Sequence, residues 1–548
     1  MADESSSHVI RGIDWKSTFP FTQIFRSFRI AIHPSKIILA LLAMLLIWFG
    51  GWFLDRVWPA SNSAVPNELG IYGESYMDAL PRNAFAAARL QVWDTMQADY
   101  KRRLTDYKVN SLGDLKDAIV KNREKEVSDA RAVFEKAKSD SAKRDAAQIT
   151  LSNAIRGAYL NAESEWDEAV LEAKGVGLFK TFYDYEIGLV NSTVVGVRHG
   201  DWFGPTGVVS SIRNFFIVAP VWAMIHHWFY FTLLFLYFLF VWSIFGGAIS
   251  RIAAVHAARD EKISIRQALR FSTSKFLSFM SAPIIPLLII LAVGVVVAIG
   301  GLLLNLPFFG PIVVGALFFL ALAAGFVMTL VLIGTAGGLN LMYPTIAVEG
   351  SDSFDAISRS FSYLYARPWR LAFYSAVAIA YGAICYLFVR YFIYLMLTVT
   401  HFFAGLLVFY SADNAGSLWN MLWPSPSSLG RLSYSINFLS LGPGQKVGAV
   451  LLAMWVYLVI CILGAFAISF YFSSSTLIYF LMRNEVDATE LDDVYLEQSE
   501  EEFTDSATIT TVAGGEVTSM STVTATAEGE GAGAVTPSTE SAPTQEGT

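Results

Sequence analysis

Residues 227–249 read HWFYFTLLFLYFLFVWSIFGGAI, a run without any Asp, Glu, Lys or Arg. An α-helix needs about 20 consecutive apolar residues to cross the hydrocarbon core of a bilayer. Inside lipid, a helix also satisfies its backbone hydrogen bonds within the segment. This stretch therefore predicts a transmembrane helix, and it sets the class of protein with which the rest of the sequence is compared.

The composition of the whole chain agrees with a membrane protein. Of its 548 residues, 54% are hydrophobic and 16% are charged, whereas soluble domains carry about 25% charged residues. The sequence predicts an all-α membrane protein built as a six-span helical bundle. Besides 227–249, the runs long enough to span are 37–54, 279–304, 311–339, 371–389 and 447–480.

These runs divide the chain into five parts. No small-residue cleavage site follows the first apolar run, so we interpret it as an uncleaved signal anchor. The predicted parts are an N-terminal segment with an amphipathic elbow (1–36), the first span (37–55), a polar insert (56–225), the remaining bundle (226–482) and an acidic tail (483–548).

The distribution of Lys and Arg predicts the orientation. Residues 1–36 carry five and residues 251–275 carry six, whereas residues 305–310 carry none. Short loops rich in Lys and Arg stay on the cytoplasmic side of the membrane. We therefore expect both termini in the cytoplasm and the insert outside it.

An apolar stretch after Arg390 leaves the span count open. Residues 391–410 are long enough to form a seventh span, which would move the tail to the other side of the membrane. We favour a helix that reaches the outer interface at Arg390, where an arginine can extend towards the headgroups. The continuation is then an interfacial or re-entrant helix.

The insert has the pattern of long, thin helices. Apolar positions recur at helical spacing among dense charges from Leu115 to Ala137 and from Ile149 to Val170. Many of these positions are Ala, which suits two helices packed closely against each other. We expect an extracytoplasmic helical hairpin of coiled-coil type, followed by an interfacial helix over residues 214–225.

The C-terminal tail differs from the insert because its charges beyond Arg483 are all of one sign. After Arg483 it contains no Lys or Arg, and its first part is acidic. Such a segment cannot bury enough apolar surface to order itself. We expect a disordered cytoplasmic tail.

A repeated element precedes three of the predicted spans. The stretches 25–36, 264–275 and 353–370 each combine Arg and Ser with Phe, Leu or Ile, and the first and third share Arg-Ser-Phe. We interpret each as an elbow, in which a helix lies on the inner leaflet with its Arg and Ser towards anionic headgroups. The arginines assigned to this surface are Arg26, Arg29, Arg266, Arg270, Arg359, Arg367 and Arg370.

Three stretches carry a resemblance. They are 246–264 with its Gly-Gly-Ala-Ile-Ser-Arg, 355–370 with Asp-Ala-Ile-Ser-Arg-Ser-Phe and Arg-Pro-Trp-Arg, and 483–496. Together they resemble a family of uncharacterised bacterial multi-pass membrane proteins, over about residues 225–500 and the first elbow. The elbows are more distantly similar to the membrane domain found with some glycerophosphodiesterases. The resemblance implies the bacterial inner membrane and supplies no catalytic residues.

Motifs for common chemistry are absent from the sequence. It contains no glycine-rich phosphate loop, HExxH or GxSxG, and Cys385 and Cys461 lie inside apolar runs. We predict no enzyme activity, no cofactor and no nucleic-acid partner. The histidines and carboxylate expected on the outer face, which could in principle bind a metal, are His199, Asp201, His226, His227 and His401.

Two functions stay open at this point. The favoured one is a non-enzymatic envelope scaffold that contacts the bilayer and binds protein partners through the hairpin and the acidic tail. The alternative is a channel or transporter for a neutral or lipid-like solute, with Asn305 and Asn340 beside helix breaks along the path. The glycine pairs 246–247, 300–301 and 337–338 are expected to permit close helix packing.

Overall fold

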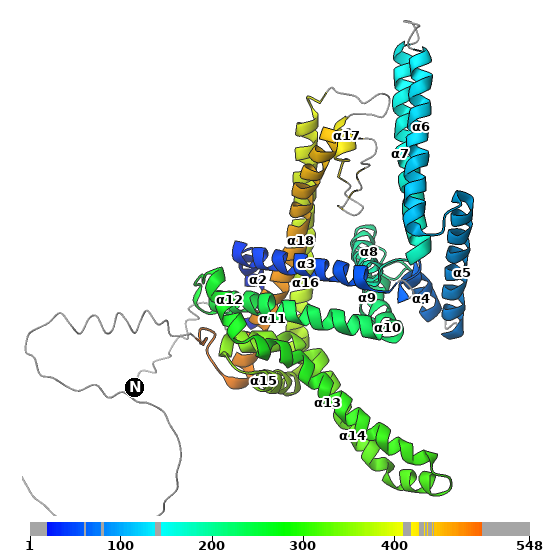
Figure 1. Cartoon of the computed structure of the whole chain (residues 1–548). Coiled ribbons are helices and arrows are strands. Elements are labelled where there is room, and N and C mark those ends of the chain that lie inside the picture. The colour runs from blue at the N-terminus through cyan, green and yellow to red at the C-terminus, as the bar shows by residue number, and fades with distance from the viewer. Residues whose placement is uncertain are drawn as a thin grey trace, which may run out of the picture. The chain divides into compact units, whose positions relative to one another are not determined.

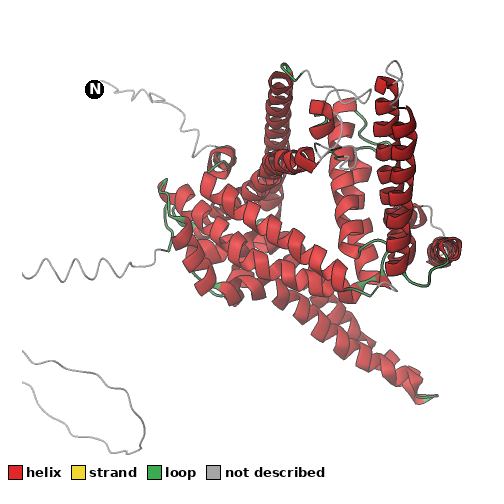
Figure 2. Ribbon diagram, turned by 45° about the horizontal axis from the view of Figure 1, so that its top comes forward, coloured by secondary structure: helices red, strands yellow, loops and turns green. Residues whose placement is uncertain are grey.

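The structure is a computed structural model that describes residues 19–59, 62–77, 82–137, 144–408, 418–426, 432, 434, 436, 441 and 443–495. Within these residues the chain forms helices joined by loops (Figure 2), and the only β pairing is an isolated bridge between Ala64 and Val176. The predicted all-α class is confirmed.

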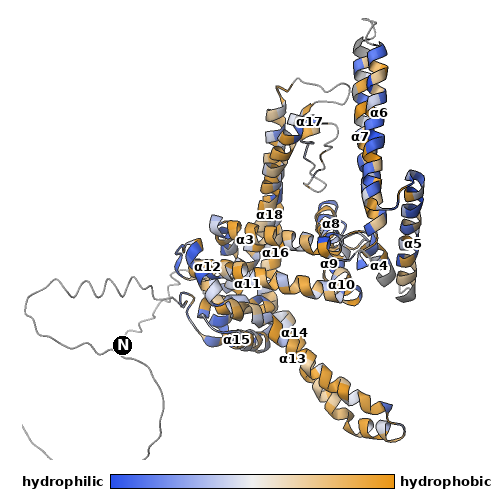
Figure 3. Ribbon diagram, in the orientation of Figure 1, coloured by the Kyte–Doolittle hydropathy of each residue, from blue (hydrophilic) through white to orange (hydrophobic). Residues whose placement is uncertain are grey.

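Six long helices contain the six predicted apolar runs, and Figure 3 shows that most of their residues are hydrophobic. Each is long and apolar enough to cross a membrane, which agrees with a multi-pass membrane protein. They are α3 (Pro34–Val57), α11 (Trp228–Arg259), α13 (Phe276–Leu302, extended by the short η3, Leu303–Asn305), α14 (Phe309–Glu349), α16 (Pro368–Gly405) and α18 (Pro443–Asp487).

A seventh apolar segment means that the count of six spans is not confirmed. Residues Val208–His226 also meet the criteria of length and hydropathy. They form two helices of nine residues, α9 (Val208–Phe216) and α10 (Val218–His226), separated at Ile217. At 1.5 Å per residue each is about 13.5 Å long, less than half of the hydrocarbon core of about 30 Å. The helical break suits the interfacial position predicted for 214–225.

The helix that contains Arg390 continues straight past this residue, which differs from the predicted re-entrant or separate segment. Helix α16 runs through this position without a turn, so residues 391–405 continue the same helix and form neither a separate span nor a re-entrant segment. The Arg390 side chain is buried and donates a hydrogen bond to Oδ1 of Asn191, 3.0 Å away. This contact joins α16 to the insert. At 38 and 45 residues, α16 and α18 are about 57 and 68 Å long.

Short helices precede three of the long ones, at the stretches of the repeated element. The elbow helices α2 (Arg26–Ala31), α12 (Ile265–Ser274) and α15 (Ser353–Ala366) precede α3, α13 and α16, and η1 (Pro20–Phe25) precedes the first of them. The long helices α11, α14 and α18 run towards this same region. Each of these three return helices ends beside a residue in the left-handed conformation, namely Asp260, Gly350 and Ala488.

The elbow helices and the adjoining ends of the long helices form one packed region, which we call the hub. Elbow helix α12 packs on α11, α15 on α14 and α2 on α18. The largest group of buried apolar side chains in the described residues lies here, and it draws on all three return helices. It includes Ile30, Ala254, Phe271, Met342, Ile346, Tyr363, Tyr374, Tyr479 and Met482.

The insert between α3 and α11 is also helical. Besides α9 and α10, its helices are α4 (Glu68–Met77), α5 (Arg82–Tyr107), α6 (Leu112–Ala137), α7 (Arg144–Lys174) and α8 (Leu178–His199). Helices α6 and α7 lie side by side over their whole length (Figures 1 and 2). Among the side chains that the structure describes in this pair, a buried apolar cluster lies at the base, formed by Leu115, Ile119 and Ala169.

The end of α18 corrects the predicted start of the tail. Residues 483–487 belong to α18, and residues 488–495 turn back over the hub as a strap. The backbone N–H of Tyr495 donates to the carbonyl oxygen of Val348, and Val494 is buried. This acidic stretch is held in place by residues of other helices. The amino-acid composition of the stretch alone cannot predict these contacts. Residues 496–548, the rest of the predicted tail, lie outside the described residues, as does most of the segment between α16 and α18 that surrounds α17 (Leu418–Leu422).

Candidate functional sites

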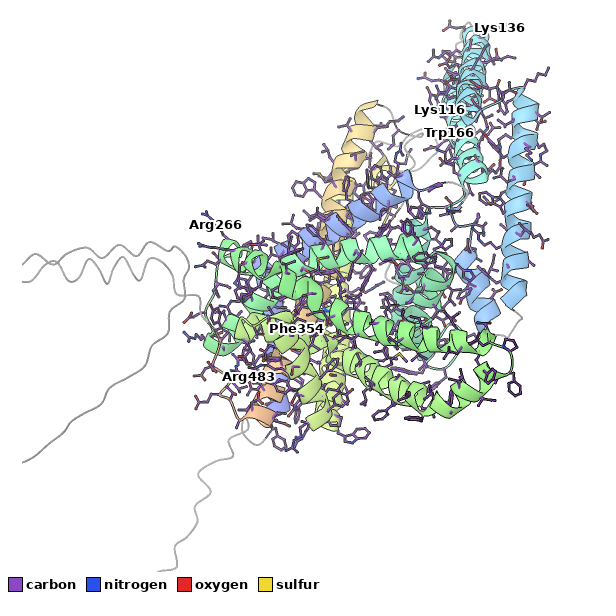
Figure 4. The ribbon with its side chains drawn as sticks, turned by 60° about the horizontal axis from the view of Figure 1, so that its bottom comes forward. Lys116, Lys136, Trp166, Arg266, Phe354 and Arg483 are labelled. Atoms are coloured by element: carbon purple, nitrogen blue, oxygen red, sulfur yellow. The ribbon has the colours of Figure 1, made fainter. Side chains whose placement is uncertain are left out.

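The arginines assigned to the elbows lie at the hub, but they differ in their surroundings. Figure 4 shows Arg266 and Arg483 on this region. Arg359 is the only one of them that is half-buried. It pairs with Asp355 at 3.0 Å and lies 3.8 Å from Glu349. Arg370 is exposed and lies 3.7 Å from Glu485. The other elbow arginines, all exposed, are Arg26, Arg29, Arg266, Arg270 and Arg367.

One serine of each elbow helix is buried and does not share a face with the exposed arginines. Each elbow helix has one serine that is completely buried: Ser27, Ser272 and Ser360. Ser272 Oγ donates to the backbone carbonyls of Ser243 and Ile244 in α11, at 2.8 and 2.6 Å. A serine at this position allows a short elbow helix to approach a return helix closely. The shared Arg-Ser motif therefore combines an exposed or ion-paired charge with a packing residue.

The elbow helices pack closely against the return helices at glycine residues. A Cβ atom at Gly247 would come within 2.5 Å of Ser272 Oγ, and one at Gly338 within 3.3 Å of Ser360 Cβ. Gly337 is in similar contact with Leu364. The predicted role of the pairs 246–247 and 337–338 in close packing is thus confirmed. At 300–301 no side chain lies within 4 Å, so that pair does not serve helix packing in the described structure.

A network of charges joins the return helices at the hub. Arg483 of α18 is 7% exposed; its Nε lies 2.9 Å from Glu349 Oε1 of α14, an ion pair without hydrogen-bond geometry. Its Nη atoms donate to the backbone and side chain of Asp493 in the strap, both at 2.7 Å. Arg251 of α11 donates to the carbonyl oxygens of Ala347 and Tyr495. The strap therefore connects all three return helices.

Tyrosines complete this network as neutral donors. Tyr363 donates to Asp487, Tyr374 to Glu485, and Tyr479 to Glu349 at 3.0 Å. Burial and the Asp487 carboxylate raise the pKa of Tyr363 to about 12, so its hydroxyl keeps its proton at neutral pH. The carboxylates at the ends of α14 and α18 are all paired within the chain. These hydrogen bonds hold the end of α18 against α14, α15 and α16.

The two asparagines of the hypothetical solute path are not brought together. Asn305 lies at the turn between α13 and α14, where its Nδ2 donates to the carbonyl of Leu302. Asn340 lies near the other end of α14 and accepts a hydrogen bond of 2.6 Å from the Tyr471 hydroxyl. Helix α14 begins at Phe309, just after Asn305, and rises about 46 Å from there to Asn340. Both amides have hydrogen-bond partners within the chain.

The histidines expected on the outer face are dispersed. His401 is bonded to the carbonyl of Trp423, and Asp201 accepts from the Gly204 N–H. Only His226 and His227 lie next to each other, at the end of α10. Across the described ranges no three His, Cys, Asp or Glu side chains are placed to hold a metal ion. The hypothetical metal site is therefore not formed by these residues.

A buried carboxylate near these histidines was not predicted. Glu68, at the start of α4, is 0% exposed and accepts hydrogen bonds from Val65 N, Trp222 Nε1 and His227 Nε2. Arg89 Nε lies 3.2 Å away. Burial by itself would raise the pKa of Glu68, but the His227 hydrogen bond, the Arg89 charge and the Val65 N–H together lower it. No periodicity marks this residue, because its partners come from distant parts of the sequence.

Comparisons with protein families, curated proteins and solved structures found no match for this chain.

Proposed function

We propose that the chain is a non-enzymatic scaffold of a bacterial inner membrane, with both termini in the cytoplasm. The insert then faces outward and presents the α6–α7 pair to a protein partner. The exposed arginines of the hub support this orientation, because anionic lipids of the cytoplasmic leaflet attract basic side chains. The hub joins the spans, and the α6–α7 pair provides the contact surface.

The observation that carries this proposal is the contrast between the base and the tip of the α6–α7 pair. At the base, Arg103 of α5 donates to Glu172 and Glu168 of α7, and Tyr107 donates to Glu165. The hydrogen bond to Glu172, with the neighbouring carboxylates, raises the pKa of Arg103 above its usual value. The base is therefore fixed to the neighbouring helix.

Towards the tip, helix α6 is more exposed than at its base. None of residues 121–136 is buried, and Val133 is 64% exposed. Charges of both signs alternate here with small apolar side chains, and Figure 4 shows Lys136 near the tip. A pair of helices that is fixed at its base and exposed over its length has the form of a contact arm. A partner would bury this surface against helices of its own.

The strap supports a second contact in the same scheme. It attaches the acidic segment to all three return helices through Arg251, Arg483 and Val348. A protein that binds the acidic tail after residue 495 would therefore be held at a defined point of the hub. In this scheme the tail is the cytoplasmic counterpart of the α6–α7 arm.

Site-specific photo-crosslinking tests the proposal. A photoreactive residue at Val133 should give one discrete adduct with another protein in intact membranes. The matched control is Phe354 of α15, which is equally exposed at 67% but lies at the hub. Adducts of the same size from both positions, or no adduct from Val133, would contradict a specific role of the arm.

A further inference from the structure

A cleft lies where the insert meets the start of α11. Its volume is about 550 Å³, within the range of about 300–1,000 Å³ typical of sites for small ligands. Glu68 and its partners form the buried layer beside it. The cleft is lined by Trp58, Asn62, Phe85, Ala86, Arg89, Leu90 and the consecutive residues His226–Tyr230.

The carboxylates beside this cleft, Glu68 and Asp55, already have partners within the chain. Both carboxylate oxygens of Glu68 have partners, and the side chain is fully buried. The Tyr230 hydroxyl donates to Asp55 Oδ1, which also accepts from the N–H of Phe179. A cation in the cleft would therefore find no free carboxylate.

Donors, in contrast, are in excess. Arg89 uses Nε for Glu68 and Nη2 for the Ser63 carbonyl, and a guanidinium has five N–H groups. The indole N–H of Trp58 is buried without a hydrogen-bond partner in the described structure. His227, which precedes α11, makes no side-chain cap, so the first N–H groups of this 32-residue helix are also uncapped. The ligand that fits is rich in acceptors and carries negative charge.

The surroundings of the cleft are apolar. On α11, Trp228 and Phe229 are exposed, and at the end of α3 the same is true of Phe53 and Val57. Exposed aromatic residues at the end of a spanning helix mark the level of the lipid headgroups. A ligand in the cleft can therefore extend its apolar part along these helices into the bilayer.

We infer that this cleft binds a phosphate ester, and that its source is the headgroup of a phospholipid. The phosphate oxygens accept from Arg89 and from the donors at the start of α11. The aromatic walls contact the glycerol part of the lipid, and the acyl chains follow α3 and α11. This site is separate from the α6–α7 arm and does not depend on the scaffold proposal.

The test measures binding to the purified full-length protein in detergent with three probes. Dioctanoyl-phosphatidylglycerol carries phosphate and chains, dioctanoylglycerol carries only chains, and glycerol phosphate carries only phosphate. We expect saturable binding of the first and none of the second. Equal binding of glycerol phosphate would show that the source is a soluble phosphate ester and would overturn the assignment to lipid.

Two variants locate the site. Ala86→Phe fills the cleft from exposed α5 and should abolish binding, whereas Ala87→Phe, at an exposed neighbour outside the lining, should leave it unchanged. Arg89→Gln should weaken binding about tenfold, by loss of a charge-assisted hydrogen bond. Binding that is equal in the two alanine variants would overturn the proposal, and far-UV circular dichroism checks that both are folded.

Discussion

The hub and the tip of the α6–α7 pair are both helical and both rich in charge. The charges of the hub pair with one another across the chain, whereas most charges of the tip face solvent. At the hub, Arg483, Glu349 and Asp493 face one another across different segments of the chain, and Arg483 is almost fully buried. At the tip, the Lys, Asp and Glu side chains of residues 121–136 and Arg131 are exposed, and Arg123 is half-buried over the Tyr159 ring.

The difference shows that the density of charge does not determine its role in this molecule. A buried ion pair is costly to break, because the remaining charge keeps no water to stabilise it. An exposed pair is screened and contributes little. The hub should therefore be sensitive to single substitutions, and the tip should tolerate them.

The largest effect is expected at Arg483. Arg483→Ala leaves Glu349 and Asp493 without their buried partner, so the free energy of unfolding should fall by about 3–5 kcal/mol. Chemical denaturation of the purified protein measures it. Arg270→Ala, at an exposed arginine of α12, is the control and should change stability by less than about 0.5 kcal/mol. Equal effects would show that the hub does not depend on its buried charges.

Packing at the hub should be nearly as sensitive. Gly247→Leu places a side chain where Ser272 and the Phe279 ring already lie, at 2.5 and 2.8 Å from the new Cβ atom. We expect a loss of about 3 kcal/mol from overpacking. Thermal unfolding of this variant is compared with that of Gly315→Leu, since Gly315 has no side chain within 4 Å. A stable Gly247→Leu protein would contradict the close packing of α12 on α11.

A buried charge outside the hub shows whether the rule is general. Glu68→Gln should lower stability by about 2 kcal/mol at pH 7, because its hydrogen bonds are then made by a neutral group. The pKa of Glu68 is below its ordinary value of 4.5 in the folded chain. Its stabilising contribution is therefore present above pH 4.5 and is lost as the pH falls through the lower, folded pKa.

The pH dependence provides the check on this prediction. The wild-type protein and the Glu68→Gln variant should approach each other in stability as the pH is lowered below 4.5. Glu74→Gln, at an exposed glutamate of the same helix, should behave as wild type throughout. A difference between wild type and Glu68→Gln that stays constant with pH would show that Glu68 is not charged in the folded chain.

The smallest effect is expected at the tip of the arm. Val133→Ser should change the unfolding free energy by less than about 0.5 kcal/mol, because surface substitutions away from packed features are nearly neutral. Leu115→Ala, at the buried base of the same helix, should cost about 3 kcal/mol. Hydrogen exchange along α6 would separate the two positions. A large effect at Val133 would mean that the tip is packed after all.

Periodicity and length predict the parts of the fold that depend on local sequence. The apolar runs mark the long helices, and the spacing of Ile119, Ala162 and Trp166 marks the base of the α6–α7 pair. Ser272 and Ser360 were predicted to face the headgroups with the arginines, but both are buried. The prediction considered only lipid as a neighbour of the elbow helix, whereas one face of this helix packs against another helix. Glu68 and Arg390 depend on partners more than 100 residues away in the sequence, as the contacts with Trp222 and Asn191 show. The strap is acidic by composition but is held by Arg251 and Arg483.

The lengths of α16 and α18 have a mechanical consequence. Both exceed the hydrocarbon thickness of about 30 Å by a wide margin. Apolar side chains such as Phe403 and Trp455 are exposed far from the hub ends of these helices. A bilayer adapts to excess apolar length through helix tilt or local thickening, and each adjustment costs free energy. Lipids with longer acyl chains reduce this hydrophobic mismatch. The free energy of α16 and α18 in a bilayer should therefore depend on the thickness of the membrane.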